Sequence, residues 1–315
     1  MPERNRPNQE HFFADLDRTP LDVIDGVDES AAPASLWSDA WHSLRRRPLF
    51  WISAALIVLV LAVAAFPSVF TSLEPRFCEL KYSLDPPSAG HPFGYDFQGC
   101  DIYARTIYGA RASVTVGVLT TLAVTLIGAI VGAFAGFYGG WFDSLLSRLT
   151  DIFFAIPLVL AAIVVMQMFR DGRTVITVVL VLGIFGWPQI ARITRGAVMS
   201  VKNADFITAA RALGSSRLMT LARHVMPNSA APIIVTATVS LGIFIVAEAT
   251  LSFLGIGLPP EITSWGADIA KAQKQLRSQP SVLFYPAGAL ALTVLSFIMM
   301  GDAVRDALDP KARKR

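Results

Sequence analysis

The sequence predicts an all-α membrane protein with six transmembrane helices. Of its 315 residues, 53% are hydrophobic and 16% are charged, whereas soluble domains carry charge on about a quarter of their residues. Mean hydropathy is +0.51. Six stretches without Asp, Glu, Lys or Arg are long enough for a helix to cross a bilayer core of about 30 Å, and too long and evenly apolar for barrel strands. These stretches are residues 48–73, 112–142, 152–169, 174–191, 225–247 and 278–301.

The chain is expected to begin with a cytoplasmic, largely flexible leader over residues 1–44. Its first 34 residues are rich in Pro, Asp, Glu and Asn and show no apolar period. No short apolar core with a cleavage site follows a basic start, so no signal peptide is expected. The first transmembrane helix, within residues 45–73, is therefore expected to remain as an anchor.

Orientation follows from the positive charges. Arg45, Arg46 and Arg47 abut the first span, and cytoplasmic loops carry an excess of Lys and Arg. If that end lies in the cytoplasm, two thirds of the 27 Lys and Arg residues also lie on the cytoplasmic side. Both termini are then cytoplasmic. The basic tail, residues 302–315, then lies beside anionic lipid, so we expect membrane lipid rather than nucleic acid as its partner.

The first large loop, residues 74–111, is expected outside the cytoplasm. It contains Cys78 and Cys100, the two cysteines of the chain. Because oxidation is permitted there, we expect a disulfide between them. The alternative is two unrelated thiols, one of them packed against lipid or a partner subunit.

The remaining five helices are expected to form a permease core over residues 112–301. Gly128, Gly132 and Gly136 repeat every four residues on one face of the second span. A face without side chains lets a second helix approach its backbone. This stripe predicts close helix packing and identifies no substrate site.

A helical hairpin is predicted on the cytoplasmic side over residues 202–227. Gly214 can supply the left-handed residue that ends its first helix, and Ser215 or Ser216 can cap the second. Pro227 is expected to mark the return to the membrane. The second helix has one apolar face, formed by Leu218, Leu221, Ala222 and Val225. Periodicity alone leaves two readings open, a helix lying on anionic lipid and an element that docks on a partner.

The residues of this hairpin carry a resemblance to a known family. Thr208-Ala209-Ala210-x3-Gly214-x9-His224-Val225-Met226-Pro227-Asn228 resembles the EAA motif of ABC importer permeases, in the form typical of the dipeptide, oligopeptide and nickel family. Further blocks agree in order, so that residues 44–310 resemble the C-type permease subunit. The blocks are residues 91–111, 136–157, 247–266 and 301–310.

The resemblance implies a type I ABC importer permease fold and a mechanical role. In similar importers the EAA hairpin enters a cleft on a cytoplasmic ATPase subunit. ATP and Mg would then be bound by that partner, and no cofactor is expected in this chain, which has no Gly-x4-Gly-Lys-Ser/Thr loop. The residues implied in coupling are Thr208, Ala209, Ala210, Gly214, Arg217, His224 and Pro227.

Two positions depart from the family pattern. Thr208 stands where the motif has Glu, which puts one ion pair with the ATPase in doubt but leaves the docking mode intact. Cys100 stands where an external Gly-Arg-Asp sequence has Arg.

Other polar residues indicate structure rather than chemistry. Glu248, at the outer end of the fifth span, is interpreted as structural, although it could line a substrate path or bind a proton. Arg148 and Asp151 have the spacing of a helical ion pair. The four His residues are scattered without a second ligand at metal spacing. We therefore expect no catalytic residues, no metal site and no enzymatic activity.

The sequence thus predicts the permease subunit of an ATP-driven importer in the cell membrane. The resemblance implies a homologous B-type permease, one or two ATPase subunits and an extracytoplasmic binding protein that delivers a dipeptide or oligopeptide. Nickel or another small solute is an alternative substrate within the same family. From other classes, an ion-gradient-coupled transporter would need ionisable groups at mid-membrane depth, and a membrane scaffold would transport nothing.

Overall fold

The computed structural model describes residues 36–169 and 172–308. Residues 1–35 of the predicted leader and 309–315 of the basic tail lie outside this description. The chain divides into two units, Met1–Asp39 and Ala40–Arg315, and the helical bundle belongs to the second. The last residues of the predicted leader, after the 34 that show no apolar period, form helix α2 (Leu36–Leu44).

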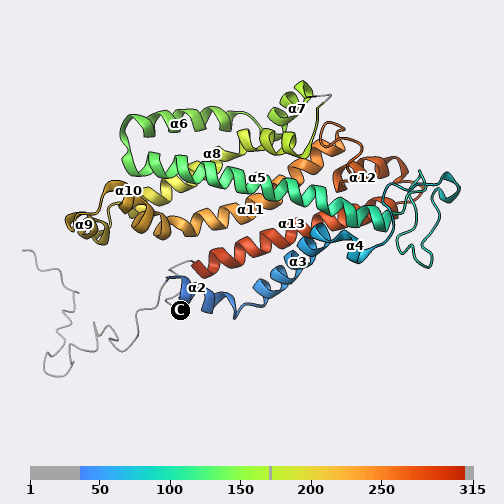
Figure 1. Cartoon of the computed structure of the whole chain (residues 1–315), viewed down its shortest axis with the longest axis horizontal. Coiled ribbons are helices and arrows are strands. Elements are labelled where there is room, and N and C mark those ends of the chain that lie inside the picture. The colour runs from blue at the N-terminus through green and yellow to red at the C-terminus, as the bar shows by residue number, and fades with distance from the viewer. Residues whose placement is uncertain (1–35, 170–171, 309–315) are drawn as a thin grey trace, which may run out of the picture. The chain divides into compact units, whose positions relative to one another are not determined.

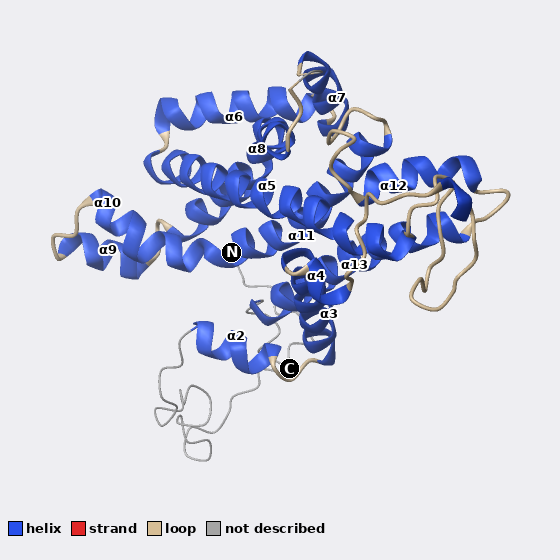
Figure 2. Cartoon of the chain, turned by 45° about the vertical axis from the view of Figure 1, so that its right-hand side comes forward, coloured by secondary structure: helices blue, strands red, loops and turns tan. Residues whose placement is uncertain are grey.

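In the described ranges the chain forms helices joined by loops, without strands (Figure 2). Five helices are long and apolar enough to cross a membrane, with α11 counted from the start of α10. The longer helices are α3 (Pro48–Ala65), α5 (Ile102–Tyr138), α8 (Val175–Val201), α11 (Met226–Phe253) and α13 (Ser281–Leu308). The short ones are α4 (Pro67–Phe70), α9 (Asp205–Ala212), α10 (Arg217–Thr220) and α12 (Trp265–Ala272). The all-α membrane fold predicted from the sequence is confirmed.

The third of the six predicted spans, residues 152–169, is not one straight helix. Helix α6 (Gly140–Ala155) and helix α7 (Leu158–Met168) meet at an angle of 84° and count as one span only as a bent pair (Figure 1). Pro157 lies between them. Proline lacks the N–H that a continuous helix needs and disfavours helical geometry at the preceding residue, which explains the break.

The first span is shorter than its uncharged stretch. Helix α3 ends at Ala65, and the four-residue helix α4 begins at Pro67 rather than continuing to residue 73. The same two effects of proline separate them.

Helix α5 begins ten residues before the predicted span. The Asp101 carboxylate accepts a hydrogen bond of 2.6 Å from the Ala104 amide and caps the helix. The expected external loop therefore ends at Asp101 instead of Arg111. The first part of the helix contains Arg105 and Arg111, so it was not included in the uncharged stretch from which the span was predicted.

Two helices continue through prolines instead of ending at them. Helix α8 runs through Pro188 to Val201, and Arg217–Phe253 is one continuous helix through Pro227. The wide π-helical turn η2 (Leu221–Val225) directly precedes Met226 and Pro227. A turn with this altered hydrogen-bond register accommodates the missing N–H of Pro227, so the helix does not end there.

The glycine stripe of α5 packs against the backbone of α8. A Cβ atom on Gly128 would lie 2.8 Å from the Trp187 carbonyl oxygen, and one on Gly132 would overlap that of Ala191 even more closely. A Cβ atom on Gly136 would lie 2.8 Å from the Arg195 carbonyl oxygen. The predicted close packing is therefore present between residues 128–136 of α5 and residues 187–198 of α8, which run beside each other (Figure 1).

The bundle has two ends that differ in content (Figure 1). We call the end with α9 and α10 the hairpin end, and the end with the Cys78–Cys100 loop and α12 the disulfide end. Helices α5 and α11 reach from one end to the other. The hydrophobic core between them combines residues of α5, α8 and α11, including Val116, Val124, Leu182 and Phe244.

Candidate functional site

The hairpin of residues 202–227 turns at a left-handed glycine. Gly214 has φ +90°, as the sequence predicted. Its amide donates to the Arg211 carbonyl at 3.0 Å, and the Ser215 amide donates to the Ala210 carbonyl at 3.1 Å. This pair of bonds is a Schellman motif, which satisfies the last carbonyls of α9 and reverses the chain.

The second arm of the hairpin begins at a serine cap and does not end before the membrane. The Ser216 hydroxyl accepts from the Met219 amide at 3.3 Å, so Ser216 is the cap of α10. Helix α10 passes through η2 directly into α11. Any displacement of the hairpin is therefore applied to a helix that spans the whole bundle.

Apolar side chains at the base of the hairpin hold it against the bundle. Ile207 and Val225 are fully buried and Leu221 nearly so, and they pack with Phe137 of α5 and Val198 of α8. Burying side chains of this size stabilises the contact by about 1.5–3 kcal/mol each. The hairpin is thus fixed to the ends of α5 and α8.

Two basic side chains of the hairpin strengthen this attachment. Lys202 Nζ donates to the Gly136 carbonyl at 2.7 Å, in the last turn of α5, where a helix dipole favours a cation. The Arg211 guanidinium lies 5.1 Å from the centre of the Phe137 ring, within cation–π range. Sequence reasoning missed both contacts, because the partners are 66 and 74 positions away in the chain.

Ion pairs between α6 and α8 lie at the same end. Arg195 contacts Asp143 with both its Nε and Nη2 atoms, the latter at 2.8 Å. Arg192 pairs with Asp151 at 2.7 Å. The expected pairing of Asp151 with Arg148 was wrong, because Asp151 pairs with Arg192 of α8 instead.

Beyond its base the hairpin is exposed. Thr208, Ala209, Gly214, Arg217 and Pro227 are exposed, whereas Ala210 and His224 are half-buried. The tip carries exposed apolar side chains: Leu213 is 90% exposed and Leu218 is 58% exposed. The apolar face expected for the second arm is therefore divided. Leu221 and Val225 are buried, but Leu218 and Ala222 are exposed.

At the disulfide end, Cys78 and Cys100 are joined in a disulfide, with Cα atoms 4.1 Å apart. The Glu79 amide donates to the Gly99 carbonyl at 3.1 Å beside it. Tyr82 and Tyr95 stack inside the loop, with ring centres 5.0 Å apart. The bond that was expected from the sequence thus closes a loop that aromatic packing also orders.

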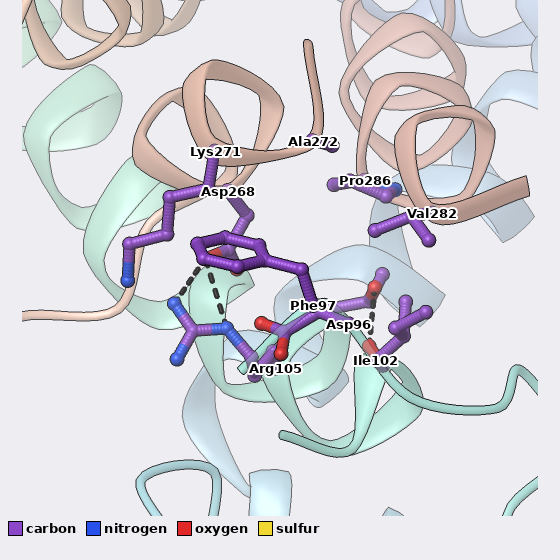
Figure 3. Close-up of a pocket in the computed structure, with 10 residues that line it drawn as sticks. Asp96, Phe97, Ile102, Arg105, Asp268, Lys271, Ala272, Val282 and Pro286 are labelled. Carbon is purple, nitrogen blue, oxygen red and sulfur yellow. Dashed lines mark hydrogen bonds and ion pairs between the residues drawn. The ribbon is translucent and has the colours of Figure 1, made fainter. Parts of the chain in front are cut away.

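A buried ion pair joins the start of α5 to α12. Arg105 contacts the Asp268 carboxylate through Nε, at 2.9 Å, and through Nη2 (Figure 3). Trp265 Nε1 also donates to the Thr106 carbonyl at 2.9 Å. A cavity of about 20 Å³ lies beside the pair, and burial lowers the pKa of Lys271 on its wall. These contacts fix α12 across the disulfide end.

Glu248 of α11 lies in a fully buried position nearby. Its Oε1 atom accepts from the Ser252 hydroxyl at 2.7 Å, and the Ser252 oxygen in turn accepts from the Leu258 amide at 3.2 Å. The carboxylate therefore helps to hold the turn that follows α11, in agreement with a structural interpretation. Among the described residues no group of three or more His, Cys, Asp or Glu is arranged to hold a metal ion.

The fold is that of a type I ABC importer permease. An inward-facing structure of the MetNI methionine ABC transporter superposes with a TM-score of 0.51 and covers 65% of this chain and 96% of its own. The identity is 18%, so this likeness concerns the fold alone.

The chain belongs to the family of binding-protein-dependent transport system inner membrane components, whose model matches residues 128–314. A second model, the N-terminal transmembrane domain of oligopeptide transport permease C, matches residues 35–87. The family expected from the sequence is confirmed, and the chain is a transport component, the permease subunit of an ABC importer.

Similar proteins align over almost the whole chain. The oligopeptide transport system permease protein OppC of Bacillus subtilis is 38% identical over 280 residues, which cover 89% of this chain and 91% of OppC. The glutathione transport system permease protein GsiD of Shigella flexneri is 38% identical over 281 residues, with 88% and 91% coverage.

Proposed function

We propose that this chain is the C-type permease of a peptide importer and forms the translocation pathway with a homologous B-type permease. The two relatives are named for oligopeptide and glutathione transport, and glutathione is itself a tripeptide. A peptide is the substrate class common to both. The direct test is uptake of labelled dipeptides and longer peptides by the reconstituted complex, with a nickel chelate as the competing substrate.

The hairpin is the element through which ATP hydrolysis reaches this permease. One observation carries this proposal: a hairpin that is rigidly anchored at its base presents exposed apolar side chains at its tip and continues into a spanning helix. Exposed Leu213 and Leu218 are suited to a cleft on a partner. ATP and Mg belong to that partner, one or two ATPase subunits, so the chain purified alone is expected to bind no ATP.

Site-directed cross-linking tests the docking. Both natural cysteines are bonded to each other, so a Leu213→Cys variant offers a single free thiol at an exposed point of the hairpin. It should cross-link to the ATPase subunit in the assembled complex. Lys274→Cys, exposed at the disulfide end, is the matched control and should not. Cross-linking of both positions, or of neither, would refute the docking.

The hairpin end is proposed to face the cytoplasm, which leaves the disulfide end for an extracytoplasmic binding protein. The positive-inside bias supports this orientation, because Arg192, Arg195, Lys202, Arg211 and Arg217 all lie at or near the hairpin end. In intact cells, a membrane-impermeant maleimide should label Lys274→Cys and leave Leu213→Cys unlabelled until the membrane is permeabilised. The reverse labelling would contradict it.

An ion-gradient-coupled transporter remains the alternative from another class. It would depend on a carboxylate such as Glu248, which the structure engages with Ser252 at the turn after α11. In proteoliposomes, uptake should require ATP on the side of the ATPase and persist when a protonophore collapses the proton gradient. Loss of uptake on adding the protonophore, with ATP present, would favour the alternative.

A further inference from the structure

A second, larger cavity opens at the disulfide end. Its volume is about 470 Å³, within the range of 300–1,000 Å³ that is typical of small-molecule sites. Four parts of the chain form its walls: residues 108–115 of α5, the segment 74–76, the first residue of α8 and the loop 261–263 before α12. The cavity is separate from the hairpin and from the small space beside Arg105 and Asp268.

The walls of this cavity carry charges of both signs. Glu74 and Glu261 contribute two carboxylates, and Arg76 and Arg111 contribute two guanidinium groups. A ligand with only one kind of charge would meet two like charges as well as two opposite ones. A ligand that carries an ammonium and a carboxylate group together finds a partner for each, which favours it over singly charged ligands.

Glu74 and Arg76 lie on a part of the cavity wall that other contacts hold in place. The Pro75 carbonyl, between Glu74 and Arg76, accepts from Arg105 Nη1 at 3.3 Å, and Arg105 is itself fixed by Asp268 (Figure 3). The disulfide at Cys78 follows two residues after Arg76. A wall that is already ordered loses little conformational entropy when a ligand binds.

The Arg111 guanidinium is also positioned before any ligand arrives. Its Nε atom donates to the Ala64 carbonyl at 3.2 Å, and Nη2 donates to the Ala65 carbonyl at 2.9 Å. These bonds cap the end of α3 and leave Nη1 for another acceptor. Arg111 therefore has a structural role in addition to lining the cavity, so it is not a suitable position for a test.

Apolar groups complete the cavity. Tyr108 and Ala112 of α5, Val175 of α8 and Ile262 of the loop all line it. They offer surface for an uncharged side chain between the charged groups. Main-chain termini of both signs with an apolar side chain between them are the chemistry of a short peptide or amino acid with free ends.

We propose that this cavity is a binding site for short zwitterionic peptides, with the ammonium group on Glu74 and Glu261 and the carboxylate on Arg76 and Arg111. The proposal rests on the peptide-import function above and adds a site to it. It places recognition of both peptide termini on the permease itself.

Blocking each terminus of one probe tests the site. The probe is the dipeptide Ala-Phe, compared with N-acetyl-Ala-Phe and with Ala-Phe amide. Binding to the assembled complex in lipid nanodiscs, without the binding protein, is measured by saturation-transfer nuclear magnetic resonance. Since exposed charge pairs contribute about 0.2–1 kcal/mol, blocking either terminus should weaken binding by up to about fivefold.

Charge-neutral variants assign each terminus to its wall. In Glu74→Gln/Glu261→Gln, N-acetylation should no longer weaken binding, whereas amidation still should. In Arg76→Gln the pattern should reverse in part, with the effect of amidation reduced and that of acetylation retained. This loss of additivity is the signature of direct contact. Asp85→Asn and Arg277→Gln change exposed charges outside the cavity lining and should retain both effects.

The possible results separate this proposal from the function on which it rests. If the complex imports Ala-Phe but the variants leave both blocking effects as in the wild type, the cavity proposal is wrong and the import function stands. Absence of saturable binding overturns the cavity proposal as well. If the variants change the effects of N-acetylation and amidation as expected, but no peptide is imported with ATP and binding protein present, the cavity proposal stands and the import function is wrong.

Discussion

Gly214 is the single residue on which the shape of the hairpin depends most directly. Its φ of +90° is a conformation that L side chains rarely adopt, although a Cβ atom there would meet no atom within 4 Å. The restriction is therefore one of backbone conformation and does not come from crowding. A substitution of Gly214 therefore tests the effect of backbone strain without adding a steric clash.

Gly214→Val is expected to strain the turn by about 1–3 kcal/mol, because a β-branched residue at positive φ is a genuine outlier. Gly214→Asn should be much milder, since Asn visits the left-handed region more readily. The measurement is ATP-driven uptake per assembled complex, with assembly quantified separately. Valine should reduce uptake sharply, and equal uptake by the two variants would contradict the role of the turn.

The sequence contained enough information to place this turn, but not its surroundings. The turn at Gly214 and a cap at Ser215 or Ser216 were predicted from residue chemistry that acts over a few positions. Gly214 has the expected positive φ, and Ser216 is the cap. The anchors Lys202 and Arg211 were missed because Gly136 and Phe137 reach them only through the fold. Local rules of capping transfer directly from sequence, whereas contacts between distant segments do not.

At the scale of single elements, the contact between α5 and α8 shows what a glycine stripe does. Gly132 faces the backbone of α8, whereas a Cβ atom added to Gly183 within α8 would meet no neighbouring atom within 4 Å. The two glycines are therefore a matched pair, one in close contact and one with space.

Gly132→Ala should destabilise the complex by about 1–3 kcal/mol, because its Cβ would overlap the Ala191 carbonyl oxygen and force the helices apart. Gly183→Ala should be neutral or stabilising by up to about 1 kcal/mol, since alanine favours the helix. Thermal unfolding of the detergent-solubilised complex, followed by size-exclusion chromatography, compares them. Similar melting temperatures for both variants would show that the stripe is not a close contact.

Two ion pairs of the bundle offer a second comparison between elements. The Arg105 and Asp268 side chains are 10% and 9% exposed, whereas those of Arg47 and Asp306, which join α3 to α13, are 34% and 58% exposed. Removing one partner from a buried pair leaves a charge without compensation and costs about 3–5 kcal/mol. An exposed pair contributes only about 0–1 kcal/mol.

Arg105→Met should therefore lower the stability of the complex far more than Arg47→Met does. The double variant Arg105→Met/Asp268→Leu should recover much of the loss, because it removes the buried charge that the single variant leaves behind. Thermal unfolding of the wild type and the three variants in one detergent measures this. A double variant as unstable as Arg105→Met alone would mean that α12 depends on more than the ion pair.

Element boundaries were the part of the fold that the sequence predicted least well. Uncharged stretches located the spans, but α5 begins within the charged segment before its stretch, and α6 and α7 divide one stretch at Pro157. Pro157 interrupts its helix while Pro188 and Pro227 do not. Whether a proline ends a helix depends on the packing around it, which a pattern of single residues does not contain.

For the whole molecule, two long helices connect the hairpin end with the disulfide end. Ile102–Tyr138 and Arg217–Phe253 each have 37 residues and are therefore about 55 Å long. Each exceeds a bilayer core of about 30 Å and projects beyond it. The turn held by Glu248 and Ser252 therefore lies at the far end of the same continuous helix that begins in the hairpin.

The disulfide should be present in protein from native membranes and should stabilise this far end. Intact mass after alkylation without reductant should show no modified cysteine, and two after reduction.

The loop that the disulfide closes, with a sequence separation of 22 residues, corresponds to a stabilisation of about 3 kcal/mol in the chain-entropy model. Cys78→Ser/Cys100→Ser should therefore lower the melting temperature of the complex, whereas Leu213→Cys labelling at the hairpin stays unchanged. Two alkylated cysteines before reduction would show that the bond is absent, and an unchanged melting temperature would show that Tyr82, Tyr95 and their neighbours order the loop without it.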